Sequence, residues 1–480
     1  MKKLTGCFLF LSAILVSAQD SVTVDSTSLS LEQVLKMTLA FHPTVSQANL
    51  LSQEADANLR MAKGRLDPKL EVDYDLKNFK EIEYFDLLTT SLKIPTWIGL
   101  DPKAEFIRNQ GDNNGQFVND QNSIPESDGF KQLHLGVALP LGKGLFFDER
   151  RNAIRQAEAF VNIAEAERTK VTNKILLNVI KDYWEWYVSY QHLVLLRQAI
   201  QLSQDLFSRT MIDYEFGEAA VVDTLQAKIN LQKRTVDFRK AQANFEVARL
   251  NLGKHLWSDQ LVPLEINSSV FPVESTLFQT PAESELKDDI SFALENHPEI
   301  GKLVGKQEQL NAGLKWAKES LKPQVDVSYS FINAPLNQNF ESETLDLGEN
   351  YKFGLDFSFP ILLRKERGKL QQTRLKITNN ELELANRQLS IRNDVIANYT
   401  QSVAFEDLLL QYSGVSDNYR RLLDAEIINL QNGETDLFKL NIQQDKFIEA
   451  QTDFFDALIK WEKSKAEYVY TIGIPFLGIQ

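Results

Sequence analysis

Residues 352–361 read KFGLDFSFPI, and this stretch decides the fold. Apolar side chains alternate with polar or small ones up to Pro360, which is the period-two pattern of a β-strand with one apolar face. The next proline is Pro475, so the chain beyond the strand is free to form very long helices. The stretch therefore predicts a strand that leads directly into a long helical region.

The same arrangement occurs earlier in the chain. Residues 133–139 alternate in the same way before Pro140, and no proline follows until Pro263. In addition, residues 42–74 match residues 297–329 at a constant offset of 255, and both segments begin with His-Pro. A match of this length at a constant offset indicates an internal duplication.

Each half is expected to contain the same elements in the same order. An amphipathic helix comes first, over about residues 31–65 and 286–321, and a strand follows it. A loop rich in Asn, Asp, Gly and Pro then precedes the second strand, and it is long in the first half (about 77–130) and short in the second (about 333–350). These patterns predict an α+β chain with four strands.

The long helical regions are each divided by one glycine, Gly217 or Gly433, so each is expected to form a hairpin of two antiparallel helices. Apolar residues within them are spaced three and four apart, as at the seam of a coiled coil. A helix over residues 147–215 would be roughly 100 Å long at 1.5 Å per residue. Hairpins of this length cannot form one compact globule, so they must pack against each other or against other subunits.

Residues 1–18 have the features of a secretory signal: two lysines, a short apolar run and a small-x-small cleavage site at its end. Cys7 is the only cysteine, so no disulfide is expected in the mature chain. No later apolar run reaches the roughly eighteen residues that a membrane helix needs. An exported chain of this kind that spans a membrane must do so as a closed β-barrel.

Four strands cannot enclose a lumen, and an open sheet edge is not tolerated in lipid, so several chains would have to share one barrel. Three chains would supply twelve strands, although two or four chains would also close a ring. A soluble sheet with one buried face would show the same alternation, and the export signal is what favours the membrane.

The order of elements, the duplication and the two glycine-centred hairpins resemble the TolC family of outer-membrane efflux factors over about residues 30–475. Two segments carry the resemblance: residues 352–361, quoted above, and the hairpin tip, which reads YEFGE at 214–218 and VDTLQA at 222–227. The resemblance implies a homotrimer with a 12-stranded β-barrel in outer-membrane lipid and an α-helical barrel in the periplasm. It also implies two partners, a periplasmic adaptor (membrane fusion) protein and an inner-membrane pump.

The chain would then be the exit duct of a tripartite efflux or type I secretion system, passively conducting substrates from the pump and adaptor to the exterior. We expect a signal peptide at 1–18, a first structural repeat at 19–257, a linker or equatorial segment at 258–285 and a second repeat at 286–480. The protein is expected in the bacterial outer membrane, extending into the periplasm.

The resemblance places function at the hairpin tips. It implies adaptor docking at the tip glycines and their neighbours, and a periplasmic gate formed by nearby charged residues and a tyrosine. The family has a carboxylate six residues after each tip glycine, and Lys439 departs from this pattern. We hypothesise that Asp223 and Lys439 pair across neighbouring hairpins in the closed state, and the alternative is that both charges are solvated. The docking residues are Phe216, Gly217, Glu218, Asn432, Gly433 and Glu434, and the gate residues are Tyr214, Asp223, Asp436 and Lys439.

The sequence gives little support for nucleic-acid binding, catalysis or a metal or cofactor site. The net charge of −14 argues against a nucleic-acid partner. No catalytic serine motif, phosphate-binding glycine loop or metal-spaced histidine cluster occurs, so we expect no enzyme activity, no cofactor and no metal site. His42 and His297 are repeat-equivalent, which favours a structural role at a helix start. A rival hypothesis is an exported coiled-coil scaffold or adhesin without a pore, and a soluble periplasmic enzyme is a third.

Overall fold

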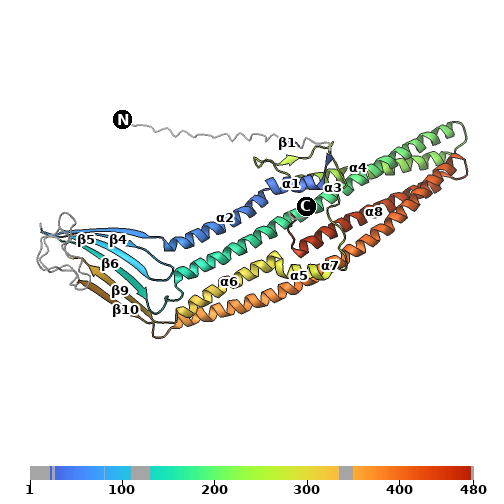
Figure 1. Cartoon of the computed structure of the whole chain (residues 1–480). Helices are drawn as coiled ribbons and strands as arrows, with labels where there is room; N and C mark the ends of the chain where they lie inside the picture. Colours follow the sequence, from blue (N-terminus) through green and yellow to red (C-terminus); the bar gives the residue numbers. More distant parts are fainter. Residues whose placement is uncertain (1–21, 24–27, 80–81, 110–129, 334–349, 477–480) are drawn as a thin grey trace, which may run out of the picture.

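The computed structural model describes residues 22–23, 28–79, 82–109, 130–333 and 350–476. A sheet lies at one end of the molecule, long helices continue from its strands, and two helical hairpins form the opposite end (Figure 1). The predicted signal at 1–18 lies outside the described residues, as do residues 80–81, 110–129 and 334–349 of the segments expected to link the strands.

Each half begins with two helices where one was expected. These are α1 (Leu31–Phe41) and α2 (Pro43–Lys63) in the first half, and α5 (Leu286–Asn296) and α6 (Pro298–Glu319) in the second. The break falls at the His-Pro dipeptide in both halves, because a residue that precedes proline is pushed out of the helical conformation. A short 3₁₀ turn, η1 (Gly64–Leu66), ends the first pair.

The repeat-equivalent histidines start the second helix of each pair, as predicted. His42 and His297 have extended backbones, and each imidazole Nδ1 accepts the backbone N–H two residues ahead, at 3.1 Å. Proline follows each histidine at the first helical position, where its missing N–H costs nothing. Each His-Pro pair therefore ends one helix and caps the next.

The two predicted hairpins are confirmed. The first consists of α3 (Glu149–Glu215) and α4 (Val221–Gly253), and the second of α7 (Arg364–Gln431) and α8 (Leu437–Ile472). Among the described residues, no helix combines the length and the apolar character needed to cross a membrane.

Within the described residues, the sheet has six strands in the order β10-β9-β6-β5-β4-β3, and all neighbours are antiparallel. Four of them are the predicted strands. Their bounds are β3 (Lys69–Phe79), β6 (Phe130–Pro140), β9 (Gln324–Ile332) and β10 (Tyr351–Ser358).

The expectation of four strands was wrong, because the segment predicted as a loop over 77–130 contains two more: β4 (Ile82–Lys93) and β5 (Asp101–Asn109). In β4, the adjacent Leu87 and Leu88 place apolar side chains on both faces, which hides the period of two. In β5, a proline and several charged residues conceal the strand. Both strands depend on pairing with their neighbours more than on their own pattern.

The segment between α4 and α5 covers the middle of the helices. It contains β7 (Leu264–Glu265) and β8 (Phe271–Pro272), which pair in parallel with β1 (Val22–Thr23) and β2 (Ser28–Leu29). The hydroxyl of Tyr183 on α3 lies 2.5 Å from the carbonyl oxygen of Val273 and 3.0 Å from that of Leu29. The main apolar core lies beneath this segment and includes the aromatic residues Tyr183, Trp184, Trp186, Tyr187 and Phe245.

Candidate functional site: the hairpin tips and the polar layer behind them

The two hairpin tips have the same geometry. Gly217 and Gly433 have φ of 77° and 76°, the left-handed conformation that favours glycine. The N–H of each glycine donates to a carbonyl three residues back, that of Tyr214 at 3.0 Å and that of Leu430 at 3.2 Å. Phe216, immediately before the first glycine, is 78% exposed. The tips are thus tight turns with an apolar side chain at the surface of the first.

The turns are completed by the residues that follow the glycines. The N–H of Glu218 donates to the carbonyl of Asp213 at 2.8 Å, and the N–H of Glu434 donates to that of Asn429 at 2.9 Å. Asn432 is the C-terminal cap of α7, and Phe216 is the C-terminal cap of α3. These bonds satisfy carbonyl groups that a helix end leaves free.

Two of the predicted gate residues cap the returning helices. The carboxylate of Asp223 accepts the N–H of Ala220 at 3.0 Å, and that of Asp436 accepts the N–H of Lys439 at 2.8 Å. A carboxylate at a helix N-terminus is favoured both by free N–H groups and by the helix dipole. Asp223 and Asp436 therefore stabilise the tips whatever else they do.

A shallow groove of about 490 Å³ lies between the two tips, and some members of both predicted sets line it. Asp223 and Asp436 line this groove from opposite hairpins, whereas Lys439 does not. Within the described part of one protomer, no ion pair joins Asp223 to Lys439, and pairing across neighbouring protomers stays a prediction. The other predicted tip residues in the groove are Glu218, Asn432 and Gly433.

Behind the tips, a polar layer joins the first hairpin to the second. The side-chain amide of Asn230 on α4 donates to Asn441 on α8 at 2.6 Å and to Gln444 at 3.3 Å. The amide of Gln444 donates in turn to the carbonyl oxygen of Ala199 on α3 at 3.2 Å. We call Ser203, Asn230, Lys233, Arg234, Asn441, Gln444 and Asp445 the polar layer.

Ionic contacts reinforce this layer. Asp445 on α8 accepts Lys233 at 2.8 Å and is also paired with Arg234, whose side chain is only 2% exposed. Burial opposes ionisation of Asp445, but hydrogen bonds from Lys233 and Arg234 outweigh it and hold the pKa of this carboxyl below its ordinary value. Asp445 is therefore charged at neutral pH and anchors two cations of the neighbouring hairpin.

Sequence reasoning missed the polar layer, although a signal was present. The apolar seam of α4 runs through Leu252, Ala248, Phe245, Ala241 and Phe238, and its next position toward the tip is Arg234. A buried cation at a seam position of a coiled coil is costly unless it is paired. Its occurrence there could have indicated a carboxylate on a facing helix.

The protomer also has two open edges. Between the sheet and the middle of the molecule, α2 packs on α3, α3 on α6 and α6 on α7. Between the middle and the hairpin tips, α4 packs on α3, α3 on α8 and α8 on α7. The sheet ends at β3, which follows α2, and at β10, which leads into α7. One edge is thus formed by β3, α2 and α4, and the other by β10 and α7 (Figure 1).

Apolar side chains at seven-residue spacing run along the outer helices of both edges. Spacing of this kind is typical of a coiled-coil seam that faces a partner helix. The α7 stripe is Leu375, Leu382, Leu389, Ile396, Val403 and Leu410, and the α4 stripe is Val222, Ile229, Val236, Ala243 and Leu250, all of them exposed.

The model of the outer membrane efflux protein family matches residues 108–256 and 290–467, one match in each half of the chain. The chain belongs to the outer membrane efflux protein family. It is thus an outer-membrane efflux channel, which extends into the periplasm and is not an enzyme. A search of curated proteins finds no match to this efflux protein.

Solved structures of outer-membrane channels and proteins have the same fold. The CmeC outer membrane channel of Campylobacter jejuni is 14% identical, with a TM-score of 0.64 over 98% of this chain and 93% of its own. VceC of Vibrio cholerae is 14% identical, with a TM-score of 0.62 over 93% and 96% of the two chains. The open state of the MtrE outer membrane channel of Neisseria gonorrhoeae is 15% identical, with a TM-score of 0.62 over 95% and 94%.

Proposed function

We propose that three copies of this efflux protein form one continuous duct, closed by pairing the β3–α2–α4 edge of each copy with the β10–α7 edge of the next. The observation that carries the proposal is that both edges are open along sheet and helices alike. Two different edges form a head-to-tail contact, which generates a closed ring when the rotation fits. The number three is the one that the family resemblance implies.

The exposed residues of the edges suit this arrangement. Pairing buries the apolar stripes of α4 and α7 between copies, and each fully buried Leu or Val contributes about 1.5–3 kcal/mol. Pairing also satisfies the free N–H and C=O groups of β3 and β10, which is obligatory inside lipid. The exposed apolar face of the sheet then lies toward lipid, and the opposite, polar face lies toward the lumen.

The partners we propose are an inner-membrane pump and a periplasmic adaptor protein that docks at the hairpin tips. An apolar side chain exposed at the end of a long helical hairpin favours contact with another protein. Phe216 and Val221 in the first hairpin and Phe438 in the second meet this description. The proposed docking residues remain Phe216, Gly217, Glu218, Asn432, Gly433 and Glu434.

The periplasmic gate is proposed at the same end. Tyr214, Asp223, Asp436 and Lys439 lie at or near the tips, and the polar layer holds the two hairpins of one copy together. Opening by separation of the hairpins has to break those polar contacts, so the layer favours the closed position. Transport energy comes from the pump, and the duct itself conducts passively.

Planar-bilayer recording of the purified protein tests this function. We expect discrete single-channel current steps that require no nucleotide or other cofactor. A preparation that binds lipid and remains folded but never conducts would favour the scaffold hypothesis.

The proposed pair of Asp223 and Lys439 is tested by the same recording. Asp223→Ala is expected to increase conductance or open time, whereas Glu215→Ala at the exposed end of α3 is not. Unchanged conductance in Asp223→Ala would remove Asp223 from the gate.

A further inference from the structure

We propose that all six strands of each protomer, including the inserted hairpin β4–β5, are wall strands of the membrane duct, so that a trimer has an eighteen-stranded wall. This inference rests on the proposed closure of the ring, but it concerns what one protomer contributes and so holds for any number of copies. The consequence is a lumen that keeps the width of the helical tube as it crosses the membrane.

The register of the sheet shows that the hairpin is continuous with its neighbours. One row of paired residues crosses all six strands on the apolar face, and the adjacent row crosses them on the polar face. The apolar row is Leu70, Leu92, Ala104, Leu135, Phe331 and Tyr351, and the polar row is Lys69, Lys93, Lys103, Gly136, Ser330 and Lys352.

The side chains of the hairpin alternate in phase with the strands on either side. Leu88, Thr90 and Leu92 of β4 lie on the same face as Tyr74, Val72 and Leu70 of β3, which are exposed. The ion pair of Arg108 and Asp86, at 3.5 Å, lies on that face toward the outer end. A lipid-facing band that gives way to charged residues is expected where a wall strand leaves the bilayer.

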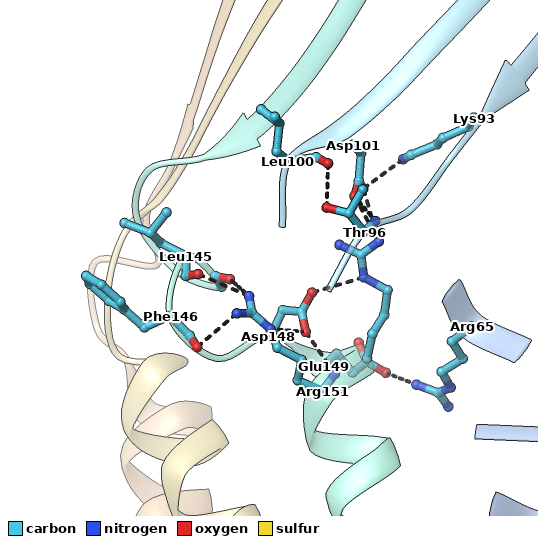
Figure 2. Close-up of polar contacts among 12 residues, drawn as sticks. Arg65, Lys93, Thr96, Leu100, Asp101, Leu145, Phe146, Asp148, Glu149 and Arg151 are labelled. Atoms are coloured by element: carbon cyan, nitrogen blue, oxygen red, sulfur yellow. Dashed lines mark hydrogen bonds and ion pairs between the residues drawn. The ribbon is translucent and has the colours of Figure 1, made fainter. Parts of the chain in front are cut away.

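The turn between β4 and β5 is bonded to the start of α3 (Figure 2). Asp101, the first residue of β5, accepts the guanidinium of Arg150 on α3 at 3.1 Å and the N–H of Thr96 at 3.1 Å. Arg150 also donates to Asp148, which caps α3, at 2.9 Å. The helix-side end of the β4–β5 hairpin therefore lies at the level where β6 leads into α3. The other strands of the sheet also meet their helices at this level.

At an ordinary strand tilt of about 40°, the widths of the two layers agree only when the hairpin is counted. Four helices side by side at about 9–10 Å separation span about 40 Å. Six strands at about 4.8 Å separation, tilted by about 40°, also span about 40 Å around the ring, whereas four would span about 25 Å. With six strands, the sheet meets the helices without an exceptional tilt.

Single cysteines in β4 test the inference, because Cys7 in the predicted signal is the only native cysteine. Proteoliposomes would carry one substitution each at Leu88, Thr89, Thr90 or Lys93. We expect Thr89→Cys and Lys93→Cys to react with a water-soluble maleimide about tenfold faster than Leu88→Cys and Thr90→Cys, since lumen-facing residues meet water and lipid-facing residues do not. Fluorophores at 88 and 90, but not at 89 and 93, should be quenched by nitroxide-labelled lipid.

The matched controls are Asp326→Cys and Val327→Cys on β9, one on each face of a strand that lies outside the inserted hairpin. If β9 alternates while β4 reacts with water at every position, the hairpin lies outside the wall and the inference is overturned. If β9 also fails to alternate, the membrane duct itself is contradicted. As a second readout, Lys93→Gln combined with Lys103→Gln should shift ionic selectivity toward cations, and an unchanged reversal potential would contradict a lumen position.

Discussion

Single residues hold the helix junctions of this molecule, and His297 illustrates how. Its Nδ1 accepts the N–H of Glu299, so the cap requires a neutral imidazole. Burial lowers the pKa of His297 from 6.5 to about 4, and the nearby Glu299 offsets this only in part. Burial also lowers the pKa of the repeat-equivalent His42, with a further contribution from His255.

The depressed pKa of His297 makes stability depend on pH. Above pH 6.5 the imidazole is neutral in both states and the cap contributes fully. As pH falls from 6.5 toward about 4, the unfolded chain takes up a proton that the folded chain does not, so stability decreases. The loss approaches roughly 3 kcal/mol per copy by the end of this window.

Replacing His297 by Asn retains a capping side chain and removes the titration. We therefore expect the fall in thermal midpoint between pH 7 and pH 4.5 to be smaller in His297→Asn than in the native protein. Differential scanning fluorimetry at the two pH values measures it. An equal acid loss in both proteins would show that His297 does not titrate as described.

At the scale of elements, the sequence pattern predicted both hairpins and four of the six strands. Proline-free helical periods with one glycine, as at Gly217, are strong local signals. The strands β4 and β5 were not predictable in this way, because Leu87, Leu88 and Pro102 obscure the alternation. Their strand conformation comes from pairing with β3 and β6, which a single sequence does not display.

The polar layer is an element-scale contact whose removal has a specific consequence. Asp445→Asn removes the closest carboxylate from the buried Arg234 and leaves only Asp237, at 3.8 Å, which costs about 1–3 kcal/mol. We expect a lower thermal midpoint and a longer open time in bilayer recordings, because α4 then separates more easily from α8. Lys446→Gln, at the exposed neighbouring position, is the control. The same midpoint and open time in both variants would contradict a role for the layer.

The whole molecule is an open protomer with two unlike edges. Leu389 on the α7 stripe is 56% exposed in the protomer, so Leu389→Glu should leave the single chain folded. In the assembled ring the same substitution would bury a carboxylate in an apolar seam, which is strongly unfavourable. We expect native mass spectrometry to find mostly monomer for Leu389→Glu and trimer for Glu381→Gln, an exposed position on the same helix. A stable Leu389→Glu trimer would exclude the stripe from the interface.

A cryo-electron microscopy reconstruction of the purified particle in nanodiscs tests the central claim most directly. We predict a hollow tube with threefold symmetry, in which β3 of each copy pairs with β10 of the next within the bilayer and the α4 and α7 stripes meet along the helical part. A closed monomer, or copies joined through any other surface with β3 and β10 unpaired, would contradict the account.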